Sequence, residues 1–308
     1  MSRVPKFIVF GGSGQVGRAL QRVLAPIGEV SVVNRHAVDL EQPDAIANVI
    51  DVVQPDAIIN AAAYTAVDRA EDEPVRAFAV NARATEKLGQ AAAKRGIWMV
   101  YYSTDYVFDG RKPSSYVESD DTGPLNVYGQ SKLQGEESLA ASGARHLILR
   151  TSWVYSAHGS NFVKTILRLA GERLDLRVVA DQVGSPTSAE LIADITAHLL
   201  SLVVTEVNAP ASLSGIYHLT PGGETSWHGL AQFILTEAKA LGFAAPLALE
   251  RIVAIRSDEF PTKAHRPLNS RLATQKLRGT FDLDLPDWRG GVADVVRQLI
   301  AQGGGYGS

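Results

Sequence analysis

Short runs of apolar residues alternate with longer amphipathic stretches through the first half of the chain. The short runs predict buried strands, and the stretches with apolar positions three and four residues apart predict helices. Strands are expected at 6–10, 30–33, 57–60, 98–103 and 146–150, and helices at 16–24, 45–53, 74–96 and 128–142. This order predicts an α/β fold of the Rossmann type, a doubly wound parallel sheet with helices on both faces.

Composition narrows the classes of function. The 308 residues include no cysteine and carry a net charge of -3. Disulfides, thiolate zinc sites and cysteine nucleophiles are therefore excluded, and neither nucleic acid nor an anionic membrane is an expected partner. The seven histidines lack the spacing of metal ligands, so no metal is expected. No apolar run reaches the roughly 18 residues of a membrane helix and no signal peptide is evident, which predicts a cytoplasmic protein.

Gly11, Gly14 and Gly17 lie between the first predicted strand and the first predicted helix. Such a turn lets the backbone approach a pyrophosphate, and the helix that follows offers unpaired N–H groups to it. A glycine-rich turn without a ligand is the alternative, and the position directly after the opening strand argues against it. We expect residues 1–150 to form a dinucleotide-binding Rossmann domain. Residues 151–308 are expected to form mainly a substrate-binding lobe, with segments near 161–182 and 188–225 returning to the Rossmann sheet.

The end of the second predicted strand bears on the choice between NADH and NADPH. An acidic residue at this point binds the free 2′-hydroxyl of NAD. The chain instead has Asn34 and Arg35, with no carboxylate before Asp39. Arg35 could pair with a 2′-phosphate, which slightly favours NADPH over NADH, or it could be a solvated surface arginine.

Tyr128 and Lys132 are four residues apart on a predicted helix, so their side chains share one face. A tyrosine, with a pKa of about 10, is a weak acid at neutral pH, and a nearby ammonium group lowers that pKa. Thr104 closes the fourth predicted strand at the edge where α/β sheets bind ligands, and a hydroxyl there can bind a carbonyl. A solvent-facing helix pair is the alternative. Together with the glycine turn, these residues predict an NAD(P)H-dependent oxidoreductase.

Several longer segments, among them Ser-Thr-Asp-Tyr-Val-Phe at 103–108 and Arg-Thr-Ser-Trp-Val-Tyr at 150–155, are more specific than the glycine turn. The chain resembles the extended short-chain dehydrogenase/reductases and, among them, the dTDP-4-dehydrorhamnose reductase family. The resembling segments are 10–17, 60–71, 102–110, 124–129, 150–155, 181–187 and 266–271.

The resemblance implies reduction of the 4-keto group of dTDP-4-dehydro-L-rhamnose, with Tyr128 as the acid, Thr104 polarising the carbonyl, and Lys132 holding the nicotinamide ribose and lowering the tyrosine pKa. The residues implied to contact the cofactor are Gly11, Gly14, Gln15, Val16, Gly17, Asn34, Arg35, Asp39, Leu40, Ala62, Ala63, Tyr64, Tyr128 and Lys132. Those implied to contact the substrate are Thr104, Asp105, Tyr106, Trp153 and Arg266. For Trp153 core packing, and for Arg266 a surface position, are the alternatives.

Some members of the family are homodimers bridged by magnesium, with a carboxylate on the first helix. Here that helix reads Arg18-Ala-Leu, with no acid, so no such metal is expected, and a homodimer remains open. Two other readings also remain: a different nucleotide-sugar reductase or epimerase, and a non-catalytic nucleotide-binding subunit like the regulatory subunit of methionine adenosyltransferase.

Overall fold

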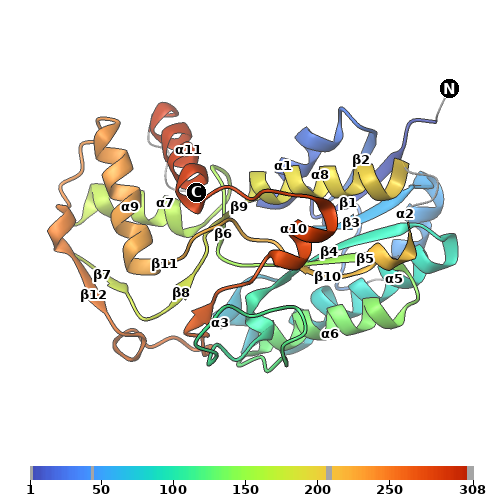
Figure 1. The fold of residues 1–308 in the computed structure, drawn as a ribbon, viewed down its shortest axis with the longest axis horizontal. Coiled ribbons are helices and arrows are strands. Elements are labelled where there is room, and N and C mark those ends of the chain that lie inside the picture. Colours follow the sequence, from blue (N-terminus) through green and yellow to red (C-terminus); the bar gives the residue numbers. More distant parts are fainter. Residues whose placement is uncertain (1–2, 43–44, 206–209, 304–308) are drawn as a thin grey trace.

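The computed structural model describes residues 3–42, 45–205 and 210–303. Its main feature is a parallel sheet of six strands in the order β10-β5-β4-β3-β1-β2 (Figure 1). The strands are β1 (Lys6–Phe10), β2 (Glu29–Val33), β3 (Ala57–Asn60), β4 (Trp98–Thr104), β5 (Arg145–Thr151) and β10 (Gly215–His218). The predicted α/β, doubly wound class is confirmed.

Helices cover both faces of this sheet (Figure 1). Phe7 and Val9 of β1 pack beneath α1 (Gln15–Leu24) and α8 (Ala189–Thr205). Ile8 and Phe10 point to the opposite face, which is covered by α2 (Ile46–Val53), α5 (Ala84–Arg95) and α6 (Val127–Ala141). The central strands β1, β3 and β4 are therefore buried on both faces, as their continuous apolar runs predict, whereas the edge strand β2 is partly exposed.

The predicted helix at 74–96 is not continuous. It consists of α4 (Pro74–Phe78), a π-helical turn η2 (Ala79–Arg83) and α5, preceded by the short α3 (Val67–Ala70). Insertions of this kind are frequent at functional sites, because the extra residue releases backbone groups from the regular ladder. Asn81, in the π turn, is completely buried.

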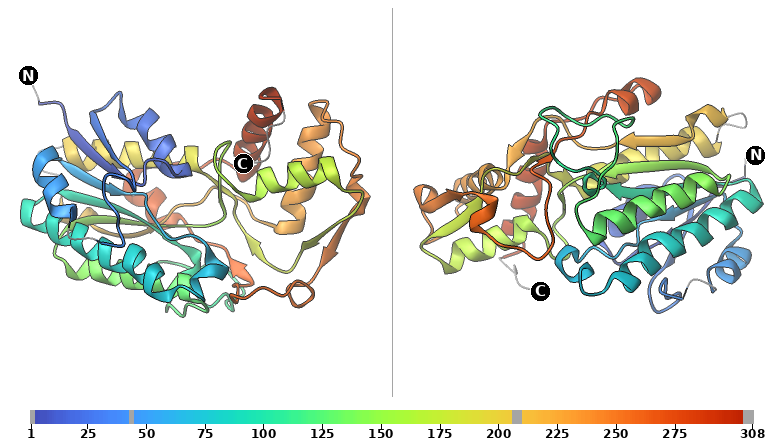
Figure 2. Two further views of the ribbon diagram at one scale, coloured as in Figure 1. Left: turned by 180° about the vertical axis from the view of Figure 1, so that it is seen from behind. Right: turned by 90° about the horizontal axis from the view of Figure 1, so that it is seen from below.

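The smaller lobe lies beyond the carboxyl ends of the strands (Figures 1 and 2). It contains α7 (Phe162–Glu172), α9 (Trp227–Ala240), α11 (Trp288–Ala301) and the parallel pair β7 (Leu176–Val179) and β12 (Ile252–Ile255). The expectation that residues 161–182 return to the Rossmann sheet is wrong, because the apolar face of α7 is buried against α9 and β7 pairs with β12. Residues 188–225, in contrast, supply α8 and the sheet strand β10.

Short elements connect the two parts. The strands are β6 (Val154–Tyr155) paired with β9 (Thr187–Ser188), and β8 (Val183–Gly184) between β11 (Thr225–Ser226) and β13 (Asn269–Ser270). The remaining helices are α10 (Gln275–Phe281) and the 3-10 turns η3 (Asp105–Val107), η4 (Ala211–Leu213), η5 (Leu249–Arg251) and η6 (Ser257–Glu259). Among the described residues, every helix is too short or too polar to cross a bilayer.

Candidate functional site

The predicted site segments meet at one edge of the sheet. The six strands are parallel, so their carboxyl ends share an edge. The glycine turn follows β1, Asn34 follows β2 and Ala62 follows β3. Thr104 ends β4, and Trp153 follows β5. Segments far apart in the sequence thereby form one site.

The glycine turn has the geometry of a phosphate-binding turn. Gly11 has φ +81, and a Cβ there would lie 2.5 Å from the backbone nitrogen of Ala62. A Cβ on Gly17 would lie 2.2 Å from the carbonyl oxygen of Gly11. The amide of Gly14 donates to that same oxygen at 3.0 Å, and Gly14 precedes the first residue of α1. The turn therefore presents bare backbone beside a helix N-terminus, which fits a dinucleotide pyrophosphate.

The first turn of α1 also joins the two lobes. Arg18 donates the first helical backbone bond, to Gly14, so the amides of Gln15 and Val16 precede the helical ladder. The Gln15 side-chain oxygen accepts hydrogen bonds from Asn161 at 2.9 Å and from Ser156 at 3.2 Å. The predicted pyrophosphate turn is thus tied directly to the smaller lobe.

The segment after β2 forms a compact turn. Asn34 Oδ1 accepts the amides of His36 and Ala37, so this side chain shapes the loop. Asp39 Oδ1 accepts the amide of Glu41 at 3.0 Å, and Leu40 is buried in the core. This loop holds the predicted adenosine-contacting residues in a fixed conformation.

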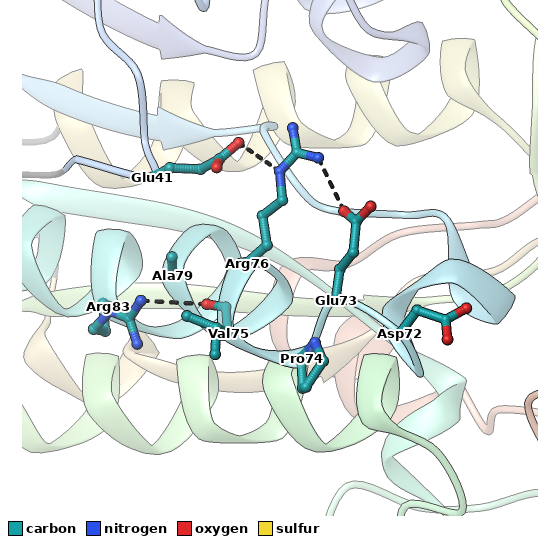
Figure 3. Close-up of a pocket in the computed structure, with 8 residues that line it drawn as sticks. All are labelled: Glu41, Asp72, Glu73, Pro74, Val75, Arg76, Ala79 and Arg83. Atoms are coloured by element: carbon teal, nitrogen blue, oxygen red, sulfur yellow. Dashed lines mark hydrogen bonds and ion pairs between the residues drawn. The ribbon is translucent and has the colours of Figure 1, made fainter.

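A charged network continues from this loop to α4. Arg35 Nη2 donates to Glu41 at 2.6 Å, and Arg76 Nε donates to the same carboxylate oxygen at 2.8 Å. Arg76 Nη1 also donates to Glu73 (Figure 3). Glu73 in turn accepts the Tyr64 hydroxyl at 2.9 Å. The sequence pattern indicates Arg35 and Tyr64 as site residues, but it gives no sign of Glu41, Glu73 and Arg76, which connect them.

Asn81 links the loop after β3 to the helix that carries Tyr128. The Tyr64 amide donates to Asn81 Oδ1 at 2.8 Å, and Asn81 Nδ2 donates to the Ser131 hydroxyl at 2.9 Å. Ser131 in turn donates to the carbonyl of Tyr128 at 2.8 Å. Helical periodicity gives no sign of this role, because it depends on the π turn. Ala62 and Ala63, half-buried, lie in the loop between β3 and Tyr64.

Tyr128 lies in the first turn of α6. That turn begins where Asn126 Oδ1 accepts the amide of Gly129 at 2.8 Å. Burial raises the pKa of Tyr128 to about 12, while the hydrogen bond with Thr104 lowers it and the charge of Asp105 raises it. A high pKa keeps the phenol protonated at neutral pH, as a proton donor requires.

Lys132 is buried one turn further along α6. Its Nζ donates to the carbonyl of Tyr102 at 2.6 Å and lies 3.9 Å from the centre of the Tyr101 ring. Burial lowers the pKa of Lys132 to about 7, and the carboxylate of Glu136 opposes that shift. The pKa of Tyr128 is set mainly by burial and not by Lys132. The expected lowering of the Tyr128 pKa by Lys132 therefore stays a prediction.

Glu136 forms a buried ion pair behind Lys132. Arg150 Nε and Nη2 donate to its carboxylate at 2.9 and 2.6 Å, and the two side chains are 2% and 3% exposed. The pair joins α6 to β5. It keeps a negative charge near the buried lysine without exposing either group to water.

The predicted substrate residues of the 103–108 segment surround Tyr128. Burial raises the pKa of Asp105 to about 7, against hydrogen bonds from Ser270 and Thr104. The Tyr106 ring packs edge-on against Tyr128, with centroids 5.7 Å apart. Burial and the charge of Asp105 raise the pKa of Tyr106, whereas the charge of Arg266 and its hydrogen bond to Tyr106 lower it.

Trp153 has an unusual backbone, with φ +50. Its ring stacks on Trp227 at a centroid distance of 3.6 Å, and a Cβ on Gly184 would lie 2.8 Å from it. Trp227 Nε1 donates to Gln182 at 3.1 Å. The side chain is half-buried, so it packs on Trp227 without being fully enclosed. A left-handed backbone in a bulky residue is strained, and such strain is concentrated at functional sites.

A recess of about 610 Å³ extends from Arg266. Its lining is rich in basic side chains and consists of Asp109, Gly110, Arg111, Lys112, Leu125, Asp181, Val183, Arg266, Leu268, Asn269 and Arg271. Arg266 Nη2 also pairs with Asp68 at 2.6 Å. Arg266 therefore connects Tyr106, beside Tyr128, to a site suited to phosphate oxygens.

Within the described ranges, no group of three or more histidine or carboxylate side chains is arranged to hold a metal ion. The expectation that no metal is needed stays a prediction.

The chain is similar to characterised reductases over nearly its whole length. The model of the RmlD substrate binding domain matches residues 5–301. The dTDP-4-dehydrorhamnose reductase of Burkholderia thailandensis is 48% identical, covering 96% of this chain and 100% of the relative. That of Escherichia coli K12 is 46% identical, covering 95% and 97%.

Solved structures of the same reductases are also similar to this chain. The dTDP-4-dehydrorhamnose reductase of Bacillus anthracis in complex with NADP has a TM-score of 0.86 and 32% identity, covering 96% of this chain and 100% of that one. The Bordetella bronchiseptica enzyme WbmG in complex with NAD, at 16% identity and a TM-score of 0.80, shows the shared fold alone. The chain belongs to the dTDP-4-dehydrorhamnose reductase family.

Proposed function

We propose that this protein reduces the 4-keto group of dTDP-4-dehydro-L-rhamnose, giving dTDP-L-rhamnose, with Tyr128 as the proton donor. The observation that carries this proposal is that half-buried Tyr128 and buried Thr104 and Lys132 gather at the carboxyl edge of the sheet, the edge that also carries the glycine turn. Reduced nicotinamide supplies a hydride when it is bound. The chain itself must position the keto sugar and protonate its oxygen.

Proton donation is assigned to the Tyr128 hydroxyl. Its pKa of about 12 keeps the proton in place until negative charge develops on the C4 oxygen. Thr104, which hydrogen-bonds Tyr128, would orient the hydroxyl and the carbonyl. Lys132, held by the Tyr102 carbonyl and the Tyr101 ring, would bind the nicotinamide ribose.

The cofactor would lie along the glycine turn. Its pyrophosphate would meet the first-turn amides of α1, and its adenosine would reach the loop after β2. There Arg35, 64% exposed, is available to a 2′-phosphate, which supports NADPH as the slightly favoured cofactor, with NADH also used.

The sugar would lie between Tyr128 and Trp153, beside Asp105. The thymidine diphosphate would extend past Tyr106 and Arg266 into the basic recess. The smaller lobe would therefore be the substrate lobe. Cytoplasmic location, possible dimerisation, and the absence of nucleic-acid and membrane partners stay predictions.

The test compares wild type with Tyr128→Phe and Thr104→Val in cofactor oxidation driven by the keto sugar, with cofactor affinity measured by calorimetry. We expect both variants to bind cofactor normally and Tyr128→Phe to lose about 100- to 10,000-fold in turnover. Near-normal turnover of Tyr128→Phe would remove it from the proton-donor role. Wild type that binds cofactor without oxidising it would favour another keto sugar or a regulatory subunit.

A further inference from the structure

Arg35 is compensated by carboxylates on its own loop. Its Nη2 lies 2.6 Å from Glu41 Oε1, and its Nε lies 3.9 Å from Asp39 Oδ1. If nothing competed with a 2′-phosphate for this arginine, its N–H donors would be free to hydrogen-bond the phosphate. The ion pair must therefore loosen when a phosphate takes the guanidinium.

Glu41 is held in place from the other side by Arg76. The Arg76 Nε lies 2.8 Å from the same oxygen that Arg35 uses, and its Nη1 lies 2.9 Å from Glu73 (Figure 3). Arg76 is 32% exposed, whereas Arg35 is 64% exposed. Arg76 is thus the more enclosed partner of Glu41, and Arg35 is the one freer to move.

Arg35 and Glu41 place two groups that can recognise the adenosine ribose side by side, a guanidinium and a carboxylate. A guanidinium suits the doubly charged 2′-phosphate of NADPH, and a carboxylate suits the 2′-hydroxyl of NADH. Because Arg76 retains Glu41, the carboxylate stays nearby when Arg35 turns to a ligand. Its negative charge then opposes a phosphate but not a hydroxyl.

We propose that Glu41 determines the ratio of NADPH to NADH affinity, by competing with the 2′-phosphate for Arg35. The inference rests on the proposed function, which places Arg35 at the 2′ position of the adenosine ribose. It adds that Glu41, and not Arg35 alone, sets the preference. Arg76 acts through Glu41 as a positioning residue.

Glu41→Gln tests the inference, with dissociation constants for NADPH and NADH measured by calorimetry. Because Arg35 is 64% exposed, removing one negative charge about 6 Å from a phosphate acts through a dielectric near that of water. This predicts a rise in NADPH affinity relative to NADH of about threefold for a singly charged phosphate and about tenfold for a doubly charged one. NADH affinity should change by less than about twofold, since glutamine keeps an acceptor oxygen. An unchanged or lower ratio would overturn the inference.

Asp72→Asn is the matched control. Asp72, Glu41 and Arg76 line a second recess, of about 360 Å³, in which Asp72 points away from Arg76 (Figure 3). Asp72 pairs with Lys263 instead. The substitution removes the same unit of charge without touching Arg35. A ratio shifted equally by both variants would indicate a general field effect and would overturn the assignment to Glu41.

Two further variants separate this inference from the proposed function. Arg35→Ala should lower NADPH affinity more than NADH affinity, and in the Arg35→Ala, Glu41→Gln double variant the gain from Glu41→Gln should disappear. If Arg35→Ala affects both cofactors equally, the placement of Arg35 fails, and the inference fails with it. If Arg35→Ala behaves as expected but the gain survives in the double variant, only the competition for Arg35 is refuted.

Discussion

Replacing Asp105 with asparagine should stabilise the unliganded protein above neutral pH. Asp105 is 2% exposed, and burial raises its pKa from 3.8 to about 7. In the folded protein the carboxyl group thus keeps its proton up to about pH 7, whereas in the unfolded chain it loses that proton near pH 4. Asp105→Asn keeps the size of the side chain and removes the ionisation.

The sign and size of the effect follow from linkage between protonation and folding. Because the folded-state pKa is raised, stability from the protonated form is fully present below pH 3.8 and is lost as the pH rises through about 7. At about 1.4 kcal/mol per pH unit, the loss reaches about 4 kcal/mol above pH 7. Partial hydration reduces this, so we expect a gain of about 2–4 kcal/mol for Asp105→Asn at pH 8 and little gain at pH 4.

Thermal unfolding followed by circular dichroism at pH 4 and pH 8 measures this difference. At roughly 2 °C per kcal/mol for a chain of this size, the variant should melt about 4–8 °C higher at pH 8. Asp109→Asn is a control of opposite sign, because hydrogen bonds from Tyr116 and the Arg111 amide lower the pKa of Asp109. It should destabilise the protein, and more at pH 8 than at pH 4.

An Asp105→Asn variant that melts no higher than wild type at pH 8 would refute this reasoning. A gain of equal size at pH 4 and pH 8 would do so too, because it would not come from ionisation. If Asp105 also contacts the sugar, the stabilised variant should lose kcat/KM for the keto sugar. A buried carboxylate that lowers the stability of the folded protein is expected at a functional site, where activity needs it.

Three other perturbations have expected outcomes. Glu136→Gln leaves the Arg150 guanidinium buried without its counter-charge, so urea unfolding should show a loss of about 3–5 kcal/mol in the free energy of unfolding. The double change Glu136→Leu, Arg150→Met should recover most of this loss. A loss below about 1 kcal/mol for Glu136→Gln would contradict the role of the pair. Gly17→Ala should weaken NADPH binding at least tenfold in calorimetry, because its Cβ would lie 2.2 Å from the Gly11 oxygen. Gly290→Ala, whose Cβ would have nothing within 4 Å, should leave NADPH binding unchanged. Equal affinities of the two variants would argue against the glycine turn as the pyrophosphate site. Trp227→Leu removes the ring stacked on Trp153 and should raise KM for the keto sugar more than it lowers kcat, while an unchanged KM would separate this stack from the substrate.

The sequence predicts the centre of the Rossmann sheet well because β1, β3 and β4 are continuous apolar runs buried on both faces. β1 and β3 begin and end where expected, and β4 differs only by including Thr104. These elements are specified locally, so periodicity and turn residues suffice. The glycine turn and the Tyr128 helix were found in the same way.

Features that depend on tertiary contacts were not predicted. Thr187 and Glu190 have the spacing of a capping box, which would make Thr187 the cap of α8. In the structure Ser188 accepts the Leu191 amide instead, and Thr187 lies in β9. Ser226, in contrast, does cap α9 by accepting the Gly229 amide at 3.0 Å, although it too lies in a short strand, β11. Local spacing alone cannot tell these two cases apart.

Site residues that act through tertiary contacts are likewise not predictable from local sequence patterns. Asn81 acts through a π turn, which interrupts an otherwise regular alanine-rich helix without a sequence signal. Glu41 and Arg76 are 35 residues apart and meet only in the folded chain. Residue types at strand ends locate the site, whereas the partners that tune it come from packing between elements.

Deuterium transfer from the cofactor to the sugar tests the central claim most directly. The wild-type protein would be incubated with dTDP-4-dehydro-L-rhamnose and NADPH deuterated at the transferable position, and the product analysed by mass spectrometry and NMR. We predict dTDP-L-rhamnose with deuterium at C4 of the sugar, formed far more slowly by Tyr128→Phe. Bound cofactor without any deuterated sugar would contradict the assignment of this chain as a dTDP-4-dehydrorhamnose reductase.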